Sequence, residues 1–134
     1  MNNRFKFRVW DNRLNDFIPL NWAEFDDYLY YDCYTVQQWS GLHDKNGVEI
    51  YEGDIVEVDT KWGNKNRFVM KFGRFQREII GYNDEAFTME INGFYFEAPN
   101  KLPFLSIVNN WQGKHDIEIT EVIGNIFENG DLLK

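Results

Sequence analysis

Cysteine is almost absent from this chain of 134 residues, which contains Cys33 alone. An internal disulfide is therefore impossible, and a reducing compartment such as the cytoplasm is the simplest expectation. Nothing next to Cys33 in the sequence indicates a thiol of lowered pKa, so we expect a small buried hydrophobe at this position.

Alanine is also scarce, since the chain has only Ala23, Ala86 and Ala98. A helical bundle would be rich in good helix formers, so that class of fold is disfavoured. Long apolar runs are missing too, because no stretch approaches the ~20 residues that cross a bilayer. The N-terminal residues MNNRFKFRVWDNR have no apolar segment of a secretory signal. We expect a cytoplasmic protein with no membrane partner.

Residues that commonly carry catalysis are few. The two serines, Ser40 and Ser106, do not lie in a nucleophile-elbow pattern. The two histidines, His43 and His115, have no His or Cys at the spacing of metal ligands. The pair His115-Asp116 resembles the His-Asp pairs of metal hydrolases only weakly. The sequence predicts no catalytic residue and no metal site, so we expect neither an enzyme nor a cofactor.

Three acidic residues near the middle of the chain could suggest calcium binding. Asp44, Glu52 and Asp54 do not have the spacing of an EF-hand loop, which needs acidic positions 1, 3 and 5, a glycine at 6 and a glutamate at 12. We therefore expect these side chains to cap turns.

The chain is rich in aromatic residues, with twelve Phe, seven Tyr and five Trp making up 18% of the sequence. This is too much apolar surface for a disordered chain, and aromatic side chains suit the half-buried surface of a sheet. No repeat, low-complexity stretch or long linker divides the sequence. These features predict a single domain over residues 1–134 of an all-β or β-dominated fold, α+β at most.

The first thirty residues contain one strand and one ambiguous stretch. Phe5, Phe7 and Val9 alternate with polar residues and predict an opening strand that ends at Asp11-Asn12. Residues 21–29 predict one short helix with a capping residue at its start, although the aromatic run over 28–31 favours a strand instead.

Residues 37–56, QQWSGLHDKNGVEIYEGDIV, predict a hairpin followed by a strand entry. Residues 44–47 end in Asn-Gly, the pair that a tight turn between twisted strands favours. Gly53-Asp54 forms a second turn and leads into a strand over 55–58, with Val56 and Val58 facing inward. Such hairpin-built antiparallel strands are typical of SH3-like and other small barrels.

The second half of the chain predicts further hairpins. A strand over 67–72 pairs with 55–58, and Gly73 and Gly81 bound another strand over 75–80. Asn92-Gly93 predicts a hairpin turn between 87–91 and 94–96. A final strand begins at Ile117, and a turn near residues 129–133 places two leucines on the domain.

Four blocks of this sequence resemble the YopX family of phage and prophage proteins: Arg8-x-Trp10-Asp11, residues 38–47 (QWSGLHDKNG), residues 49–56 (EIYEGDIV) and residues 122–129 (VIGNIFEN) followed by Leu132-Leu133. The resemblance spans nearly the whole chain and implies a β-rich fold encoded by a bacteriophage or prophage. The family has no established biochemical activity, so it transfers no catalytic residue.

The motif positions that carry the resemblance have the chemistry of structural residues. Glycines stand at turns, Asp and Asn at caps, and aromatic residues on alternating positions. We predict structural roles for Trp10, Asp11, Gly41, Asp44, Gly47, Tyr51, Gly53, Asp54, Gly124 and Asn125.

One segment of this acidic chain is strongly basic. The net charge is −8, yet residues 61–77 hold six basic residues and no acidic one. Cations interleaved with aromatic rings suit single-stranded nucleic acid, although the net charge of the whole chain opposes such binding. The alternative is a solvated hairpin whose cations pair with acidic neighbours. The candidate nucleic-acid residues are Lys61, Trp62, Lys65, Arg67, Lys71, Arg74 and Arg77.

The aromatic excess indicates an interface, because a domain of this size cannot bury all its rings. Alternation places some of Trp10, Tyr30, Tyr31, Tyr82, Tyr95 and Trp111 outward. The leading hypothesis is an accessory protein that binds a host or phage protein, with self-association into a homo-oligomer. The alternatives are nucleic-acid binding through residues 61–77, or sequestration of a small nucleotide-like ligand on an aromatic platform.

Overall fold

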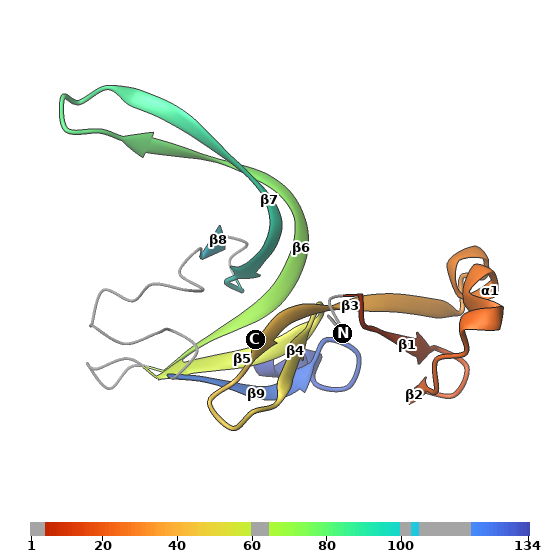
Figure 1. The fold of residues 1–134 in the computed structure, drawn as a ribbon. Helices are drawn as coiled ribbons and strands as arrows, with labels where there is room; N and C mark the ends of the chain where they lie inside the picture. The colour runs from red at the N-terminus through yellow and green to blue at the C-terminus, as the bar shows by residue number, and fades with distance from the viewer. Residues whose placement is uncertain (1–4, 60–64, 100–102, 105–118) are drawn as a thin grey trace.

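The structure, a computed structural model, describes residues 5–59, 65–99, 103–104 and 119–134, which form two antiparallel sheets (Figure 1). The first sheet has the strand order β2-β1-β3-β4, and the second, curved as a half-barrel, has the order β8-β7-β6-β5-β9. The strands are β1 (Phe7–Asp11), β2 (Asp16–Ile18), β3 (Tyr34–His43), β4 (Glu49–Tyr51), β5 (Asp54–Asp59), β6 (Lys65–Ile80), β7 (Ala86–Glu97), β8 (Pro103–Phe104) and β9 (Thr120–Asn125). The predicted β-dominated fold with hairpin-built sheets is confirmed.

Helical structure between β2 and β3 consists of η1 (Trp22–Glu24) followed by α1 (Phe25–Tyr30). The Asn21 side chain caps η1 by accepting from the Ala23 amide at 3.1 Å. Tyr28 is buried, and its ring meets the Tyr34 ring edge-on with centroids 5.3 Å apart. The short helix predicted within residues 21–29 is confirmed. The alternative of a strand over 28–31 is wrong, because the Tyr28 ring anchors a helical turn onto β3.

The predicted hairpin over residues 37–51 is present as β3 and β4. The Asp44 amide donates to the Val48 carbonyl at 2.8 Å, and Gly47 closes the turn with a φ of 82°. Trp39 pairs with Tyr51 and His43 with Glu49, with an irregular stretch of β3 between Trp39 and Leu42. The turn chemistry of residues 44–47 therefore sets this hairpin as expected.

The main core lies where the two sheets meet. Ile50 of β4 packs with side chains from β5, β6 and β7, and the buried members are Ile50, Val56, Val58, Phe68, Met70 and Phe96. Val56 and Val58 face inward as predicted, and β5 pairs with β6 in the predicted hairpin, with Val56 opposite Phe68. The residues that join these two strands, 60–64, lie outside the described residues, and so does Ile117, where the final strand was expected to begin.

The longest element is the hairpin of β6 and β7, which pair without interruption from Val69–Glu97 to Ile80–Ala86. Two turn predictions are wrong here. Gly73 does not end a strand, and Asn92-Gly93 is not a turn, because Gly73 and Gly93 face each other inside the ladder. The chain reverses instead at residues 81–85, where the Gly81 amide donates to the Glu85 carbonyl at 2.9 Å and Asp84 adopts a φ of 59°.

Most of this hairpin projects from the rest of the molecule (Figure 1). The pairing of β5 with β6 ends at Val69, and β8 pairs only with Phe96 and Glu97 of β7. Residues 71–95 therefore form a two-stranded ribbon, which we name the arm. The remaining described residues are named the body.

The C-terminal residues pack back onto the start of β6, as predicted. They form η3 (Gly130–Leu133), and the Arg67 guanidinium donates to the Leu132 carbonyl at 3.0 Å. This contact joins the end of the chain to the body near the first residues of β6.

Candidate functional site

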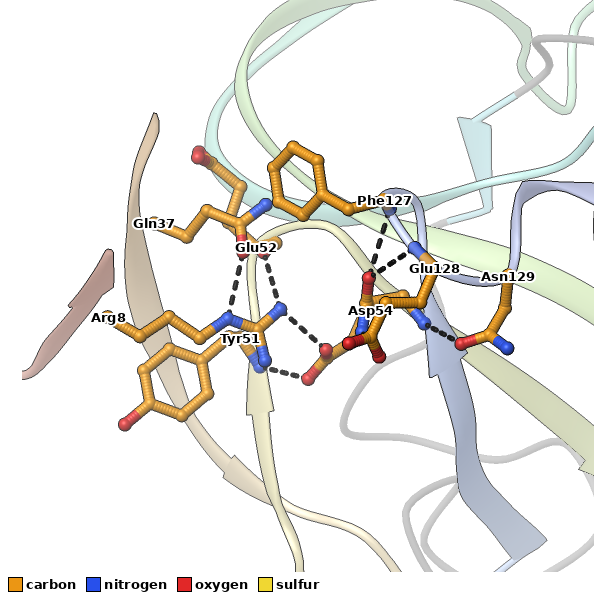
Figure 2. Close-up of polar contacts among 9 residues, drawn as sticks. Arg8, Gln37, Tyr51, Glu52, Asp54, Phe127, Glu128 and Asn129 are labelled. Carbon is orange, nitrogen blue, oxygen red and sulfur yellow. Dashed lines mark hydrogen bonds and ion pairs between the residues drawn. The ribbon is translucent and has the colours of Figure 1, made fainter. Parts of the chain in front are cut away.

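A polar network joins the two sheets in the middle of the body (Figure 2). Arg8 of β1 donates from Nε to Gln37 Oε1 of β3 at 2.8 Å and from Nη2 to Asp54 Oδ1 of β5 at 2.7 Å. The second carboxylate oxygen of Asp54 accepts from the Tyr51 amide at 2.8 Å. Three strands that are distant in the sequence are thereby tied to one guanidinium.

The surroundings of this network favour a structural role. The Arg8 guanidinium lies between two rings, 4.4 Å from the Phe17 centroid and 4.7 Å from the Tyr51 centroid. Burial raises the pKa of Asp54, and the nearby Arg8 offsets only part of this effect. Asp54 is buried and paired with Arg8, and rings cover the Arg8 guanidinium, so the arrangement is suited to holding the strands together.

Gly53 is required by close packing in this network. A Cβ at Gly53 would lie 2.1 Å from Gln37 Nε2, and its φ is 87°. The Gly53 amide donates to the Met70 carbonyl at 2.8 Å, and its carbonyl accepts from the Ile126 amide at 2.9 Å. The Gly-Asp turn at 53–54 thus connects β5 to β6 and to the segment after β9.

Asp44 connects the β3–β4 turn to β9. Its Oδ1 accepts from the Asn46 and Val48 amides at 2.8 and 2.9 Å, and its Oδ2 accepts from the Val122 amide at 2.9 Å. The expected turn-capping geometry is present, with the addition of a contact to a distant strand.

Asn125 organises the turn that follows β9. Its Oδ1 accepts from the Phe127 and Glu128 amides, each at 3.0 Å (Figure 2). Gly124 lies against the Asn129 side chain, where an added Cβ would be 2.5 Å from Oδ1. The turn presents the Phe127 ring to Trp10, and the two rings stack with centroids 4.7 Å apart.

The remaining motif positions also lie in the body. Asp11 accepts from the Arg13 amide at 2.8 Å, and hydrogen bonds from Arg13 lower the pKa of Asp11. Gly41 lies in the irregular stretch of β3. All ten motif residues lie in the body, and the arm contains none of them.

The candidate nucleic-acid residues that the structure describes lie along β6, and several of them pair with carboxylates. Lys65 and Arg67 lie 3.8 and 3.3 Å from the Glu57 carboxylate, and Arg74 lies 2.5 Å from Glu90. Lys71 is close enough to Glu52 to lower its pKa, although burial of Glu52 raises that pKa by more. Lys61, Trp62 and the Arg77 side chain lie outside the described part of the structure. The positive charge available to phosphates is thus smaller than the sequence suggests.

A pocket of about 250 Å³ lies beside the network and is lined by Gln37, Glu52, Lys71 and Phe72, among others. Sites for small molecules commonly occupy ~300–1,000 Å³. This pocket is therefore small for a nucleotide, and its Phe72 ring already packs against Phe94 with centroids 4.8 Å apart.

The described residues contain neither a metal-binding cluster nor a helix that could span a membrane. Within those ranges, no group of three or more His, Cys, Asp or Glu side chains could hold a metal ion. His115 and Asp116 lie outside them. Every described helix is too short or too polar to span a bilayer.

Large apolar side chains gather uncovered at the far end of the arm. Ile80 is 70% exposed, Tyr82 is fully exposed and Phe87 is 52% exposed. Phe72, nearer the body, is 54% exposed. Among the described residues, this ribbon pairs with strands of the body only at its base.

The six aromatic residues, some of which were expected to face outward, differ in exposure. Tyr30, Tyr31 and Tyr82 are exposed, and Tyr95 is half-buried. Trp10 is buried against Phe127, because the turn after β9 covers it. Trp111 lies outside the described residues.

The fold therefore defines a β-dominated protein with a cross-linked body and a projecting two-stranded arm. The sequence model of the family described as YopX protein matches residues 19–134. The chain belongs to the YopX protein family, which confirms the resemblance noted from its motifs.

A comparison of structures also finds relatives. The chain is similar to the crystal structure of protein EF1440 from Enterococcus faecalis, with a TM-score of 0.56 and 23% identity over 96% of this chain and 97% of the other. This likeness concerns the fold alone. No curated protein matches the chain.

Sequence reasoning missed Arg8 and Gln37 as organisers of the network. Arg8 lies in a motif block but 46 residues from Asp54, and no local pattern pairs the two. Reasoning from sequence also missed the arm, because Asn92-Gly93 was interpreted as a turn. The available signal was the apolar alternation of Phe87, Met89 and Ile91, which Tyr95 continues in the same phase beyond Gly93.

Proposed function

We propose that this chain is a phage or prophage accessory protein that acts in the bacterial cytoplasm by binding another protein, without catalysis. The arm is the contact element in this proposal. The observation that carries it is the exposure of Ile80, Tyr82 and Phe87 at the end of a ribbon that reaches beyond the body. Membership of the YopX family supports the phage origin.

Physical considerations support the arm as a binding element. A two-stranded ribbon is marginal on its own in water, and exposed aromatic side chains are enriched where proteins bind one another. Tyrosine supplies a large contact area with few rotatable bonds, which lowers the entropy cost of docking. A partner that covers this tip would bury apolar surface and stabilise the ribbon.

The test is affinity purification of the full chain from host cells, followed by identification of proteins that co-purify. The tip variant Tyr82→Ser/Phe87→Ser is expected to lose a specific partner that the wild type retains. Leu14→Ser is the matched control, because Leu14 is 66% exposed on the body. Equal recovery of that partner with the tip variant would contradict the proposal.

The basic segment supports the nucleic-acid alternative less well. Glu57 and Glu90 offset the charge of Lys65, Arg67 and Arg74, so fewer cations remain for phosphate contacts. A gel shift with DNA or RNA, read together with the purification above, tests this alternative. A salt-sensitive gel shift that Lys65→Glu/Arg67→Glu abolishes, together with unchanged protein partners in the tip variant, would favour nucleic acid over the arm.

A further inference from the structure

Along the arm, the edge of β6 away from β7 pairs with no strand of the described residues. Successive residues of a strand direct their backbone groups to opposite sides, and the Met70 carbonyl accepts from the Gly53 amide on the side away from β7. The ladder with β7 continues without a register shift through Ile80. The even-numbered residues from 72 to 80 therefore direct their N–H and C=O groups outward, and no described strand pairs with them.

The side chains of these same five residues share one face of the ribbon and are all exposed: Phe72, Arg74, Gln76, Glu78 and Ile80. Their order is self-complementary about Gln76. Apolar residues stand at the two ends, and opposite charges stand next to the centre. The edge thus offers both backbone groups and a matched row of side chains.

From this pattern we propose that β6 pairs antiparallel with β6 of a second copy of this chain, about a two-fold axis at Gln76. Arg74 then lies opposite Glu78 of the other copy, and Phe72 lies opposite Ile80. The inference rests on the proposed role of the arm as a contact element and names a partner for one of its edges. The tip side chains Tyr82 and Phe87 lie outside the paired stretch.

The charge pattern selects this register over its neighbours. If the two-fold axis lay at residue 75 instead, Phe72 would lie opposite Glu78, and with the axis at Arg74 that residue would lie opposite its own copy. If the axis lay at residue 77, Arg74 would lie opposite Ile80, and with the axis at Glu78 that residue would lie opposite its own copy. Opposite charges across a strand pair stabilise it and like charges destabilise it, so the register centred on Gln76 is favoured.

Arg74 is suited to join two carboxylates in this arrangement. Its side chain is 65% exposed although it contacts Glu90 of β7, so part of the guanidinium faces solvent. In the paired state it lies between Glu90 of its own copy and Glu78 of the second copy. In the dimer each copy covers the edge of the other, which prevents the aggregation that an unpaired strand edge favours.

The experiment measures the mass of the full chain by light scattering and sedimentation from low to high micromolar concentration. The wild type is expected at twice the chain mass of 16.1 kDa. Arg74→Glu and Glu78→Arg each place two like-charged pairs in the symmetric interface, so each should raise the dimer Kd about tenfold or more. The double variant Arg74→Glu/Glu78→Arg restores opposite charges and should recover dimerisation.

Glu85→Arg is the matched control, since it makes the same charge change in the turn beyond the paired stretch and should leave the dimer intact. Circular dichroism confirms that each variant is folded, and recovery in the double variant separates pairing from misfolding. A monomeric wild type at high micromolar concentration overturns the inference. A dimer Kd that is unchanged in both single variants also overturns it, as does a double variant that dimerises more weakly than either single variant.

The outcomes separate this inference from the proposed function. If the wild type is a monomer and still loses its partner in the Tyr82→Ser/Phe87→Ser variant, only the pairing of β6 is wrong. If the charge swap behaves as expected but the tip variant keeps every partner, only the role of the tip is wrong.

Discussion

The body and the arm are built from the same kind of hairpin but are stabilised differently. In the body, strands from both sheets enclose Ile50, Met70 and Phe96, and Arg8 joins Gln37 to Asp54 inside it. In the arm, two strands hold each other by their backbone ladder, while side chains such as Phe72 and Ile80 face solvent. The family motif residues lie in the body, whereas the arm depends on its own ladder and leaves apolar side chains exposed.

The largest expected effect on stability comes from replacing a phenylalanine of the body by alanine, compared with the same replacement in the arm. Phe96→Ala leaves a cavity in the core, where Phe96 is 1% exposed, and should lower the free energy of unfolding by about 3–5 kcal/mol. Phe72→Ala, at a position 54% exposed in the arm, should cost less than about 1 kcal/mol. Chemical denaturation of both variants checks this, and similar losses would remove the distinction between body and arm.

A smaller effect tests the packing at the centre of the body. Gly53→Ala combines a positive φ with a clash against Gln37 and should lower the free energy of unfolding by about 2–3 kcal/mol. Gly47→Ala is the control, because Gly47 also has a positive φ but no atom lies within 4 Å of an added Cβ. It should cost about 1 kcal/mol. If the two variants lose stability equally in urea titrations, close packing at Gly53 contributes nothing.

The smallest effect concerns the carboxylate at the boundary of the two regions. Burial raises the pKa of Glu52, so between its unfolded and folded pKa values the folded state holds more protons. This contribution to wild-type stability therefore falls as pH rises through the folded pKa. Glu52→Gln removes this loss of stability with pH, so the variant should be more stable than wild type at pH 7, by up to about 0.5 kcal/mol. Thermal melts from pH 4 to 8 should show the difference grow with pH, and a constant difference would contradict the cause.

Local sequence patterns predicted the elements whose contacts are local. The turn at 44–47 and the short helix after Asn21 depend on residues a few positions apart, and both were predictable. The Asn92-Gly93 turn was wrongly predicted, because Gly93 pairs with Gly73 in a longer ladder that local turn chemistry cannot reveal. The Arg8–Asp54 pair joins residues from two sheets, so only the fold brings it into view.

The facing glycines of the arm have a mechanical consequence. At the level of Gly73 and Gly93 neither strand carries a Cβ, and open space surrounds both positions. Stiffness against bending is therefore lowest at this rung, because only the backbone supports it. We therefore expect the arm to bend more easily at this pair of glycines than at its other rungs, and such bending would leave the hydrogen bonds of the body intact.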